Sequence, residues 1–390
     1  MNSARVYQWL AQEPGQAALL GGVGADQGGR ILQKFLNNSG VVSYLAEHSD
    51  LPTGHCIALV QGPERTLGKF KGIVCNTITT PPSYLHTGHC TDLVQGPERT
   101  LGLNTVLNSE VVYVEGYFLI HSPEVTCKLA QLSHKHNKKF VFNLCGEYVC
   151  ENIEFVQQVL QLFPYINFLF GNRSEFKAFL RTAQENNIYS PILQKLNKVE
   201  STESSNIQCT NNLSNDNYLI AVVTEGSEKV SLHFIPPEAD SKTTADSSLT
   251  ADIYSSAADL PAESSPSDLI STPDLSPTFK SKSTTDSCSI SFPVPPVPES
   301  EIQDTIAAGD SFIAGFIYTL IHRGTLDHCV KNAIWTAQKM IRQSGSSLPS
   351  TLPDLPEAQC RLPKNPSNLL SPKKKGVPME KAKKSLKIKS

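Results

Sequence analysis

The sequence has 390 residues, of which 39% are hydrophobic and 18% charged, so it is long enough for one large domain or two ordinary ones. Its formal net charge of −3 gives no reason to expect a nucleic acid or a membrane surface as a partner. No apolar run approaches the length that spans a bilayer, and residues 1–15 lack the apolar core of a signal peptide. The ten cysteines form no C-x-x-C pair, which favours reduced thiols in a cytosolic protein.

Helical and strand patterns alternate over residues 1–50. Apolar spacing predicts helices over residues 6–10 and 30–36, and short apolar runs predict strands over residues 17–20 and 41–46. Alternation of this kind is typical of βαβ units and of a parallel sheet.

A duplicated segment follows. Residues 53–68 recur almost unchanged as residues 87–102, at an offset of 34 residues (87 minus 53). Stacked repeat arrays need at least three units, so we interpret the pair as a duplication of one strand-turn-strand unit. Only one copy can occupy one place in the fold. The first copy keeps an apolar strand at residues 57–60, whereas the second has Thr91 and Asp92 there but lies nearer the downstream core, so both assignments stay open.

The alternation resumes between residues 110 and 224. Short apolar runs predict buried strands, and apolar residues three or four positions apart predict amphipathic helices between them. The expected strands span residues 111–114, 140–144, 166–170 and 218–224, and the expected helices span residues 124–136 and 155–162.

Polar segments interrupt this pattern. Residues 197–217 and residues 236–291 are poor in apolar side chains, and the second segment is rich in Ser, Thr, Asp and Pro. Because such a composition buries too little apolar surface to offset the entropy of ordering, we predict that residues 236–291 are disordered. Order is expected to return near Glu301, with helices over residues 309–323 and 329–343.

Residues 304–312, with the sequence DTIAAGDSF, carry the clearest chemical signal. Small residues permit close backbone approach, and they lead into a helix N-terminus, where free N–H groups and the positive end of the dipole bind anions. A carboxylate there, Asp310, can accept a proton from a hydroxyl nucleophile. Phosphoryl transfer requires this combination, although Asp310 could also be an ordinary helix cap.

This segment resembles the Asp-Thr-x-Gly-Ala-Gly-Asp signature of the ribokinase-like (PfkB) carbohydrate and nucleoside kinases. The resemblance implies that Asp310 is the catalytic base and that the backbone of Ala307, Ala308 and Gly309 forms an anion hole. Ala307 stands where the family has glycine. Its methyl group could crowd the phosphate or oppose a positive φ angle.

Other matches occur in the family's order. Residues 22–29 resemble its Gly-x-Ile-Gly-x-Asp-x-x-Gly segment. Asn172 and Glu175 match its Asn-x-x-Glu motif, which implies that they help to place Mg²⁺, and the same spacing is that of a helix capping box. Thr224 and Gly226 match a loop that approaches ATP, or they form an ordinary turn after a strand.

The middle of the chain is similar to the adenosine kinases of this family. The resemblance implies that Phe118 and Tyr148 are aromatic residues near the nucleoside, where an aromatic face packs well on a purine. Plain core packing is the alternative for both. Asn2 corresponds to an asparagine that holds the ribose. Either Arg65 or Arg99, one from each copy of the duplicated segment, corresponds to the arginine that neutralises the transferring phosphate.

The implied architecture is a three-layer α/β/α domain with a central, mostly parallel sheet and an incomplete small lid. The lid is expected to be incomplete because Asn2 matches a position well inside the family's sequences, and we therefore expect weak activity or none. The predicted organisation is a kinase domain in two parts, residues 1–235 and 292–352, a disordered insert at residues 236–291, and a basic disordered tail at residues 353–390.

The implied reaction is transfer of a phosphoryl group from ATP, with Mg²⁺ as cofactor, to the 5′-hydroxyl of adenosine. We expect a monomer with adenosine and ATP as partners and neither membrane nor nucleic acid. A cytosolic location is expected, and the lysine-rich tail is either a nuclear import signal or a solvated chain end.

Three other functions are consistent with parts of the sequence. The chain could be a non-catalytic, kinase-derived binding protein, or a sugar kinase of the same family. It could also be a dinucleotide-binding oxidoreductase, because Gly22, Gly24 and Gly28 follow a predicted strand and Glu47 ends the next one. That last reading leaves the segment at residues 304–312 unexplained.

Overall fold

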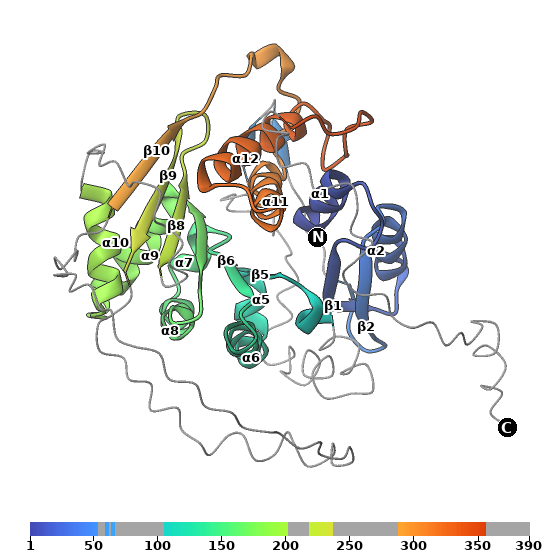
Figure 1. The fold of residues 1–390 in the computed structure, drawn as a ribbon. Coiled ribbons are helices and arrows are strands. Elements are labelled where there is room, and N and C mark those ends of the chain that lie inside the picture. The colour runs from blue at the N-terminus through green and yellow to red at the C-terminus, as the bar shows by residue number, and fades with distance from the viewer. Residues whose placement is uncertain (54–58, 62–63, 67–104, 202–217, 237–287, 356–390) are drawn as a thin grey trace, which may run out of the picture. The chain divides into compact units, whose positions relative to one another are not determined.

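The computed structural model describes residues 1–53, 59–61, 64–66, 105–201, 218–236 and 288–355, coloured along the chain in Figure 1. The chain divides into two compact units. Unit 1 comprises Met1–Thr79 and Val297–Ser390, and unit 2 comprises Thr80–Pro296.

Unit 2 is built on a six-stranded sheet in the order β10-β9-β8-β7-β6-β5. Neighbouring strands from β5 to β8 run parallel, whereas β9 is antiparallel to both β8 and β10. The strands are β5 (Val111–Glu115), β6 (Lys139–Asn143), β7 (Phe168–Asn172), β8 (Leu219–Thr224), β9 (Lys229–Ile235) and β10 (Cys288–Pro293). The predicted α/β fold with a mostly parallel sheet is therefore confirmed.

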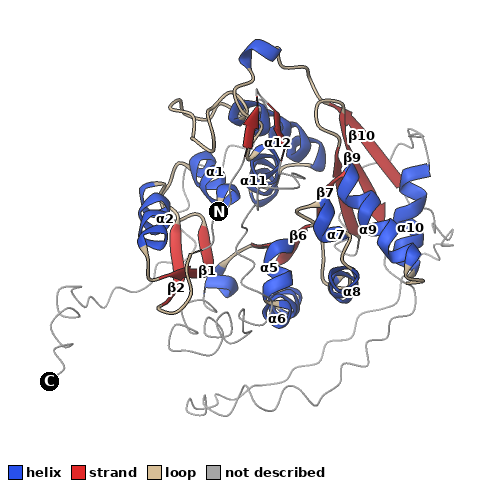
Figure 2. Cartoon of the chain, turned by 180° about the vertical axis from the view of Figure 1, so that it is seen from behind, coloured by secondary structure: helices blue, strands red, loops and turns tan. Residues whose placement is uncertain are grey.

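The helices of unit 2 lie between its strands in sequence and beside them in Figure 2. They are α5 (Gly116–His121), α6 (Pro123–Lys135), α7 (Glu147–Cys150), α8 (Ile153–Leu162), α9 (Arg173–Glu185) and α10 (Pro191–Ser201). Alternate strand residues join one core with these helices, for example Phe140, Phe142 and Leu169, all at most 2% exposed. The two-residue period of those strand residues is what one buried sheet face requires.

Two predictions for unit 2 are corrected by the structure. The segment predicted to be disordered up to residue 291 is wrong at its end, because β10 begins at Cys288 and pairs along its whole length with β9. Here Ile290 and Phe292 alternate with serines, a pattern that suits an edge strand once β9 supplies its hydrogen bonds. Helix α10 likewise runs to Ser201, into the stretch read as polar loop.

Unit 1 contains a two-stranded parallel sheet and helices from both ends of the chain. Helix α1 (Asn2–Ala11) packs on α11 (Ala308–Ile321), which packs on α12 (Leu326–Met340). The paired strands are β1 (Ala18–Gly24) and β2 (Val42–His48), linked by α2 (Gln27–Asn38), and a short 3₁₀ helix spans Glu299–Glu301. Val6, Leu10 and Met340 form the centre of the cluster between α1 and α12.

The first copy of the duplicated segment forms a hairpin in unit 1. Strand β3 (Leu59–Gln61) pairs antiparallel with β4 (Glu64–Thr66), as the strand-turn-strand interpretation predicts. The second copy lies outside the described residues.

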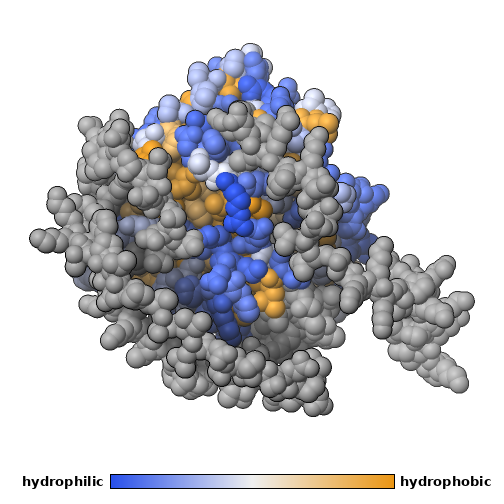
Figure 3. Space-filling model, in the orientation of Figure 1, coloured by the Kyte–Doolittle hydropathy of each residue, from blue (hydrophilic) through white to orange (hydrophobic). Residues whose placement is uncertain are grey.

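The hydropathy of the surface does not distinguish one unit from the other. On the face drawn in Figure 3, hydrophobic patches lie among hydrophilic side chains, as they do on most soluble domains. Among the described residues, none of the helices combines the length and apolar character needed to cross a membrane.

Candidate active site

The backbone at the start of α11 presents free hydrogen-bond donors. Ala307 precedes the helix with φ 58° and ψ 13°, and no side chain caps this end. The N–H of Ala308 donates to the carbonyl of Thr305 over 3.3 Å, whereas no acceptor for the N–H groups of Gly309 and Asp310 is found among the described residues. A β-carbon built on Gly309 would meet nothing within 4 Å. Donors that face open space at a helix N-terminus suit an anion.

Ala307 adopts the left-handed conformation that the sequence comparison anticipated for a glycine. A side chain at positive φ is strained, at a cost of roughly 1 kcal/mol. The loop therefore holds a non-glycine residue at a positive φ angle.

We expect Ala307→Gly to raise the free energy of unfolding by about 1 kcal/mol, because glycine carries no β-carbon to strain at this φ angle. Urea denaturation would measure it. The matched control is Ala308→Gly, one residue later inside the helix, which should instead lower stability by about 0.5 kcal/mol. A lower stability for both variants would contradict the strain at Ala307.

Asp304 fixes the loop that leads into α11. Its side chain is 4% exposed, and its two carboxylate oxygens accept from the N–H of Ile306 over 2.9 Å and from the N–H of Gly345 over 2.7 Å. Its own N–H donates to the carbonyl of Ile341 at the end of α12 over 3.1 Å. Sequence reasoning did not assign Asp304 a role. The one feature of the sequence that could have indicated it is that this acid is the first residue of the segment at residues 304–312.

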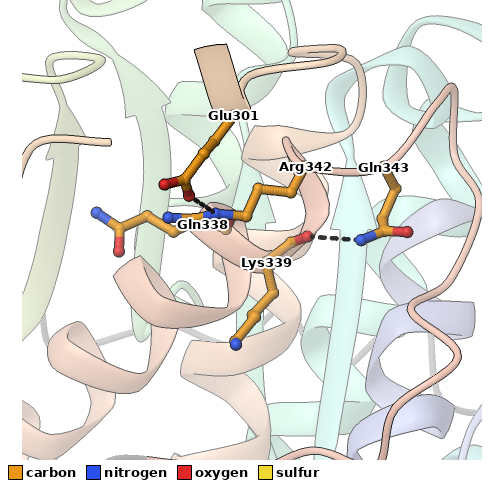
Figure 4. Close-up of polar contacts among 5 residues, drawn as sticks. All are labelled: Glu301, Gln338, Lys339, Arg342 and Gln343. Carbon is orange, nitrogen blue, oxygen red and sulfur yellow. Dashed lines mark hydrogen bonds and ion pairs between the residues drawn. The ribbon is translucent and has the colours of Figure 1, made fainter. Parts of the chain in front are cut away.

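A neighbouring ion pair ties the same segment to α12. Glu301 accepts from the Nε of Arg342 over 2.7 Å, beside the hydrogen bond from Gln343 to the carbonyl of Lys339 (Figure 4). The Glu301 and Arg342 side chains are 49% and 32% exposed, so solvent weakens this pair, and the buried Asp304 bonds dominate the anchoring.

Asp304→Ala should lower the free energy of unfolding by about 3 kcal/mol, because two part-buried N–H groups lose a charged acceptor. Urea denaturation would measure the change. Glu301→Ala is the matched control, and we expect it to cost less than about 1 kcal/mol. Equal losses in the two variants would refute the anchoring role of Asp304.

Asp310 is held by the first turn of α1. One oxygen of its carboxylate accepts from the Asn2 amide over 3.0 Å, and the other accepts from the Ser3 hydroxyl over 3.1 Å. The Asp310 side chain is half-buried and caps no backbone N–H of its own helix, so the alternative of an ordinary helix cap does not hold. Ser3, which the sequence did not single out, is a positioning partner for the predicted base.

Asn2 also presents an unused acceptor. Its side-chain Oδ1 is buried and receives no hydrogen bond from any described residue. An acceptor left without a donor costs free energy unless a ligand supplies one. Helix α1 is itself held by Arg5, which donates to the Ser39 hydroxyl and to the carbonyl of Ser346, each over 3.0 Å.

The carboxyl ends of the parallel strands carry the predicted metal and nucleotide residues of unit 2. Asn172 ends β7 and is the register partner of Thr224, which ends β8. Ligands of α/β proteins commonly bind outside this edge of the sheet. The structure thus brings Asn172 and Thr224, which come from two separate motifs, together at one edge of the sheet.

Asn172 and Glu175 form a complete capping box at the start of α9. The Asn172 Oδ1 accepts from the N–H of Glu175 over 2.9 Å, and the two Glu175 oxygens accept from the backbone and side-chain N–H groups of Asn172 over 2.8 Å each. Burial raises the pKa of Glu175. Because both carboxylate oxygens are already bonded, the pair fits a Mg²⁺ ion held through water better than direct ligation. No group of three or more His, Cys, Asp or Glu residues that could hold a metal occurs in the described part of the chain.

The turn after β8 is organised by Glu225. Its carboxylate forms ion pairs with Arg173 at 2.8 Å and with Lys229 at 3.7 Å. Gly226 follows at φ 59°, with open space where a β-carbon would stand. The predicted ATP-binding residues Thr224 and Gly226 therefore flank an acid to which sequence reasoning gave no role.

The ring of Tyr148 lies beside that of Tyr117. The rings of Tyr117 and Tyr148 lie 6.3 Å apart, and Tyr148 is 59% exposed. The Tyr117 hydroxyl donates to the carbonyl of Cys145 over 3.2 Å, and burial raises the pKa of this hydroxyl. Tyr117 and Phe118 are both partly buried and pack against the main core of unit 2, and the nucleoside role of Phe118 stays a prediction.

The glycines of the β1–α2 turn accommodate the chain itself. In the first turn of α2 the N–H of Gly29 donates to Asp26 over 2.8 Å, and a β-carbon on Gly24 would lie 2.5 Å from the carbonyl of Leu51. A dinucleotide would need this space and these donors, so the geometry disfavours the oxidoreductase alternative. Of the two candidate arginines, Arg65 lies in β4 and Arg99 lies outside the described residues.

A family model described as pfkB family carbohydrate kinase matches residues 97–232 and 287–353, just over half of the chain. The chain belongs to the pfkB family. Arabidopsis thaliana adenosine kinase 2 is 25% identical to this family member over 353 residues, which span 89% of the chain and 78% of the relative. Dictyostelium discoideum adenosine kinase is 22% identical over 355 residues, spanning 91% of the chain and 81% of the relative.

Solved structures of the same kind share the fold of this pfkB chain. Anopheles gambiae adenosine kinase, in complex with P1,P4-di(adenosine-5) tetraphosphate, is 24% identical with a TM-score of 0.57, over 90% of this chain and 81% of that one. Schistosoma mansoni adenosine kinase, in complex with 2-fluoroadenosine, is 19% identical with a TM-score of 0.58, over 90% and 80%. The predicted ribokinase-like fold and kinase family are confirmed.

Proposed function

We propose that the chain transfers the γ-phosphoryl group of ATP to the 5′-hydroxyl of adenosine, giving AMP and ADP. The observation that carries this proposal is the placement of Asp310 in the first turn of α11, with its carboxylate held by Asn2 and Ser3 and with free backbone donors beside it. A base and an anion hole at one helix start are the parts that phosphoryl transfer needs.

In this proposal Asp310 takes the proton from the 5′-hydroxyl as its oxygen attacks the γ-phosphorus, and ADP leaves. The N–H groups of Gly309 and Asp310 donate to the transferring phosphoryl oxygens, where charge develops. Asn2 already touches Asp310 and has a buried acceptor to offer, which suits a ribose hydroxyl as its donor.

The carboxyl edge of unit 2 would serve the nucleotides. Asn172 and Glu175 would hold Mg²⁺ through water, and the ion would neutralise phosphate charge. Thr224 and Gly226 would contact ATP at the turn after β8. Tyr148 would present an aromatic face to the purine.

Tyr117, whose ring lies beside Tyr148, would lie near the nucleoside as well, and the role of Phe118 there stays a prediction. The transferring phosphate would be neutralised by Arg65 or Arg99. Four expectations from the sequence stay predictions: weak activity or none, a monomeric state, a cytosolic location, and the role of the lysine-rich tail.

Chromatographic detection of AMP tests this function directly. The purified chain is incubated with MgATP and either adenosine or ribose. Adenosine-dependent AMP supports the proposal, whereas ribose phosphate without AMP would make the chain a sugar kinase. ATP binding without either product would favour the non-catalytic binding protein.

A further inference from the structure

An ion pair joins the two segments of unit 2 that carry the predicted metal and ATP residues. Arg173, the first residue of α9, places its Nη1 2.8 Å from the Oε2 of Glu225 in the turn after β8. Arg173 directly follows Asn172 of the predicted metal pair. Glu225 stands between Thr224 and Gly226, the predicted ATP-binding residues. The ion pair therefore bridges the two predicted nucleotide motifs, although sequence reasoning gave neither of its members a role.

The two segments separate at the point where the ion pair joins them. Asn172 and Thr224 are the last register partners of β7 and β8. Beyond them one segment enters α9, and the other turns back into β9, with the N–H of Glu225 donating to the carbonyl of Lys229 over 2.9 Å. The contact between Arg173 and Glu225 thus fixes the turn relative to the start of α9 where the pairing of the two strands has ended.

Glu225 is better shielded from water than its partner. The side chain of Glu225 is 10% exposed and that of Arg173 is 41% exposed. A carboxylate that is largely withdrawn from water attracts a nearby cation more strongly than one on the surface does. Lys229 adds a second cation at 3.7 Å from the same carboxylate. Because two cations face this one acid, its charge is compensated where the phosphates of a nucleotide would approach.

A second ion pair on the same helix provides the comparison. Arg181 of α9 lies 2.8 Å from Glu151, the residue that follows α7. The distance equals that of the first pair, but these side chains are 54% and 42% exposed, and neither residue adjoins a predicted nucleotide motif. An exposed pair of this kind contributes little. The two pairs therefore differ in shielding and in place, and not in chemistry.

We propose that Arg173 and Glu225 are positioning residues for ATP, because their ion pair holds the turn after β8 against the start of α9 so that both motifs bind one nucleotide. Neither residue needs to touch the ligand. They act through Thr224 and Gly226 on one side and Asn172 on the other, and a ligand that contacts both segments binds best when their relative position is fixed in advance. The contact itself stands on the distances, and the identity of the ligand rests on the proposed kinase function.

Equilibrium binding of ATP in the presence of Mg²⁺, measured by titration calorimetry without adenosine, tests this proposal with no turnover. Arg173→Gln and Glu225→Gln should each raise the Kd for ATP about tenfold. The double variant should raise it no further, because both substitutions break the same contact. The Kd for adenosine, measured separately, should stay within about twofold in all three variants.

Arg181→Gln is the matched control, and it should leave the Kd for ATP within about twofold. The Tm should change by no more than about 3 °C in any of these variants, since each pair is partly exposed. Arg173→Lys keeps the positive charge and should recover part of the affinity for ATP. That variant keeps the test decisive if a glutamine variant fails to fold.

Three results would overturn the proposal. One is weaker ATP binding in Arg173→Gln with tighter binding in Glu225→Gln, since the two residues would then act as separate charges on the phosphates. Another is an equal loss of affinity in Arg181→Gln. Either result leaves the proposed function standing. The third is an unsubstituted chain that binds adenosine but no ATP, which would remove the proposed function together with this inference.

Discussion

Asp310→Asn should lower the kcat for AMP formation by about a thousandfold, because the reaction loses its general base. The amide has the size of the carboxylate and can still accept from the Ser3 hydroxyl. On the other side, the Asn2 amide can rotate and turn its unpartnered Oδ1 toward the new donor. We therefore expect the Tm to stay close to that of the unsubstituted chain, so that the loss of rate reports chemistry and not folding.

Asp327→Asn is the matched control for that prediction. Asp327 is a half-exposed acid in the first turn of α12, paired with Lys331 at 2.8 Å, and has no contact with the site of Asp310 in the described structure. Its kcat should stay within about twofold of the unsubstituted chain, as for a surface ion pair. A rate for Asp310→Asn above about a tenth of the original would remove Asp310 from the role of base.

Gly309→Ala should lower kcat/KM at least about 100-fold without loss of stability. A β-carbon at this position meets no atom within 4 Å, so the fold accepts it, and alanine inside a helix is if anything stabilising. The open space beside Gly309 is where we place the transferring phosphoryl group. A methyl group there obstructs the approach of the phosphate to the two free N–H groups.

The matched control for this substitution lies in the same helix. A β-carbon on Gly315 would stand 2.5 Å from the Thr336 hydroxyl, between α11 and α12. Gly315→Ala should therefore lower the Tm through overpacking, with an activity loss no larger than the unfolded fraction explains. Unchanged kcat/KM in Gly309→Ala would mean that the phosphate does not use this helix start.

Local patterns in the sequence were sufficient for most elements of the fold. The apolar run at residues 140–144 and the small residues before α11 each predict a structure that is found, because one segment contains the whole signal. The capping box of Asn172 and Glu175 is equally local. Its spacing fits both a helix start and a metal motif, and the structure realises the first.

Contacts between distant segments were beyond such reasoning. Ser3 and Asp310 are 307 residues apart, and Asp304 reaches Gly345 on the far side of α12, so no window of sequence contains either pair. The ring of Tyr117 lies beside that of Tyr148, 31 residues further along the chain (148 minus 117), and no local pattern contains that contact. Strand β10 was missed because its serines suggest disorder until the pairing with β9 is known.

The central claim is that a base at the start of α11 drives phosphoryl transfer to adenosine. It is tested most directly by quantifying AMP and ADP together after the purified chain and its Asp310→Asn variant are given MgATP and adenosine. Equal amounts of both products from the unsubstituted chain, and a rate about a thousandfold lower from the variant, are the predicted result. AMP formation at the same rate by both proteins, or ADP release without AMP, would contradict the account.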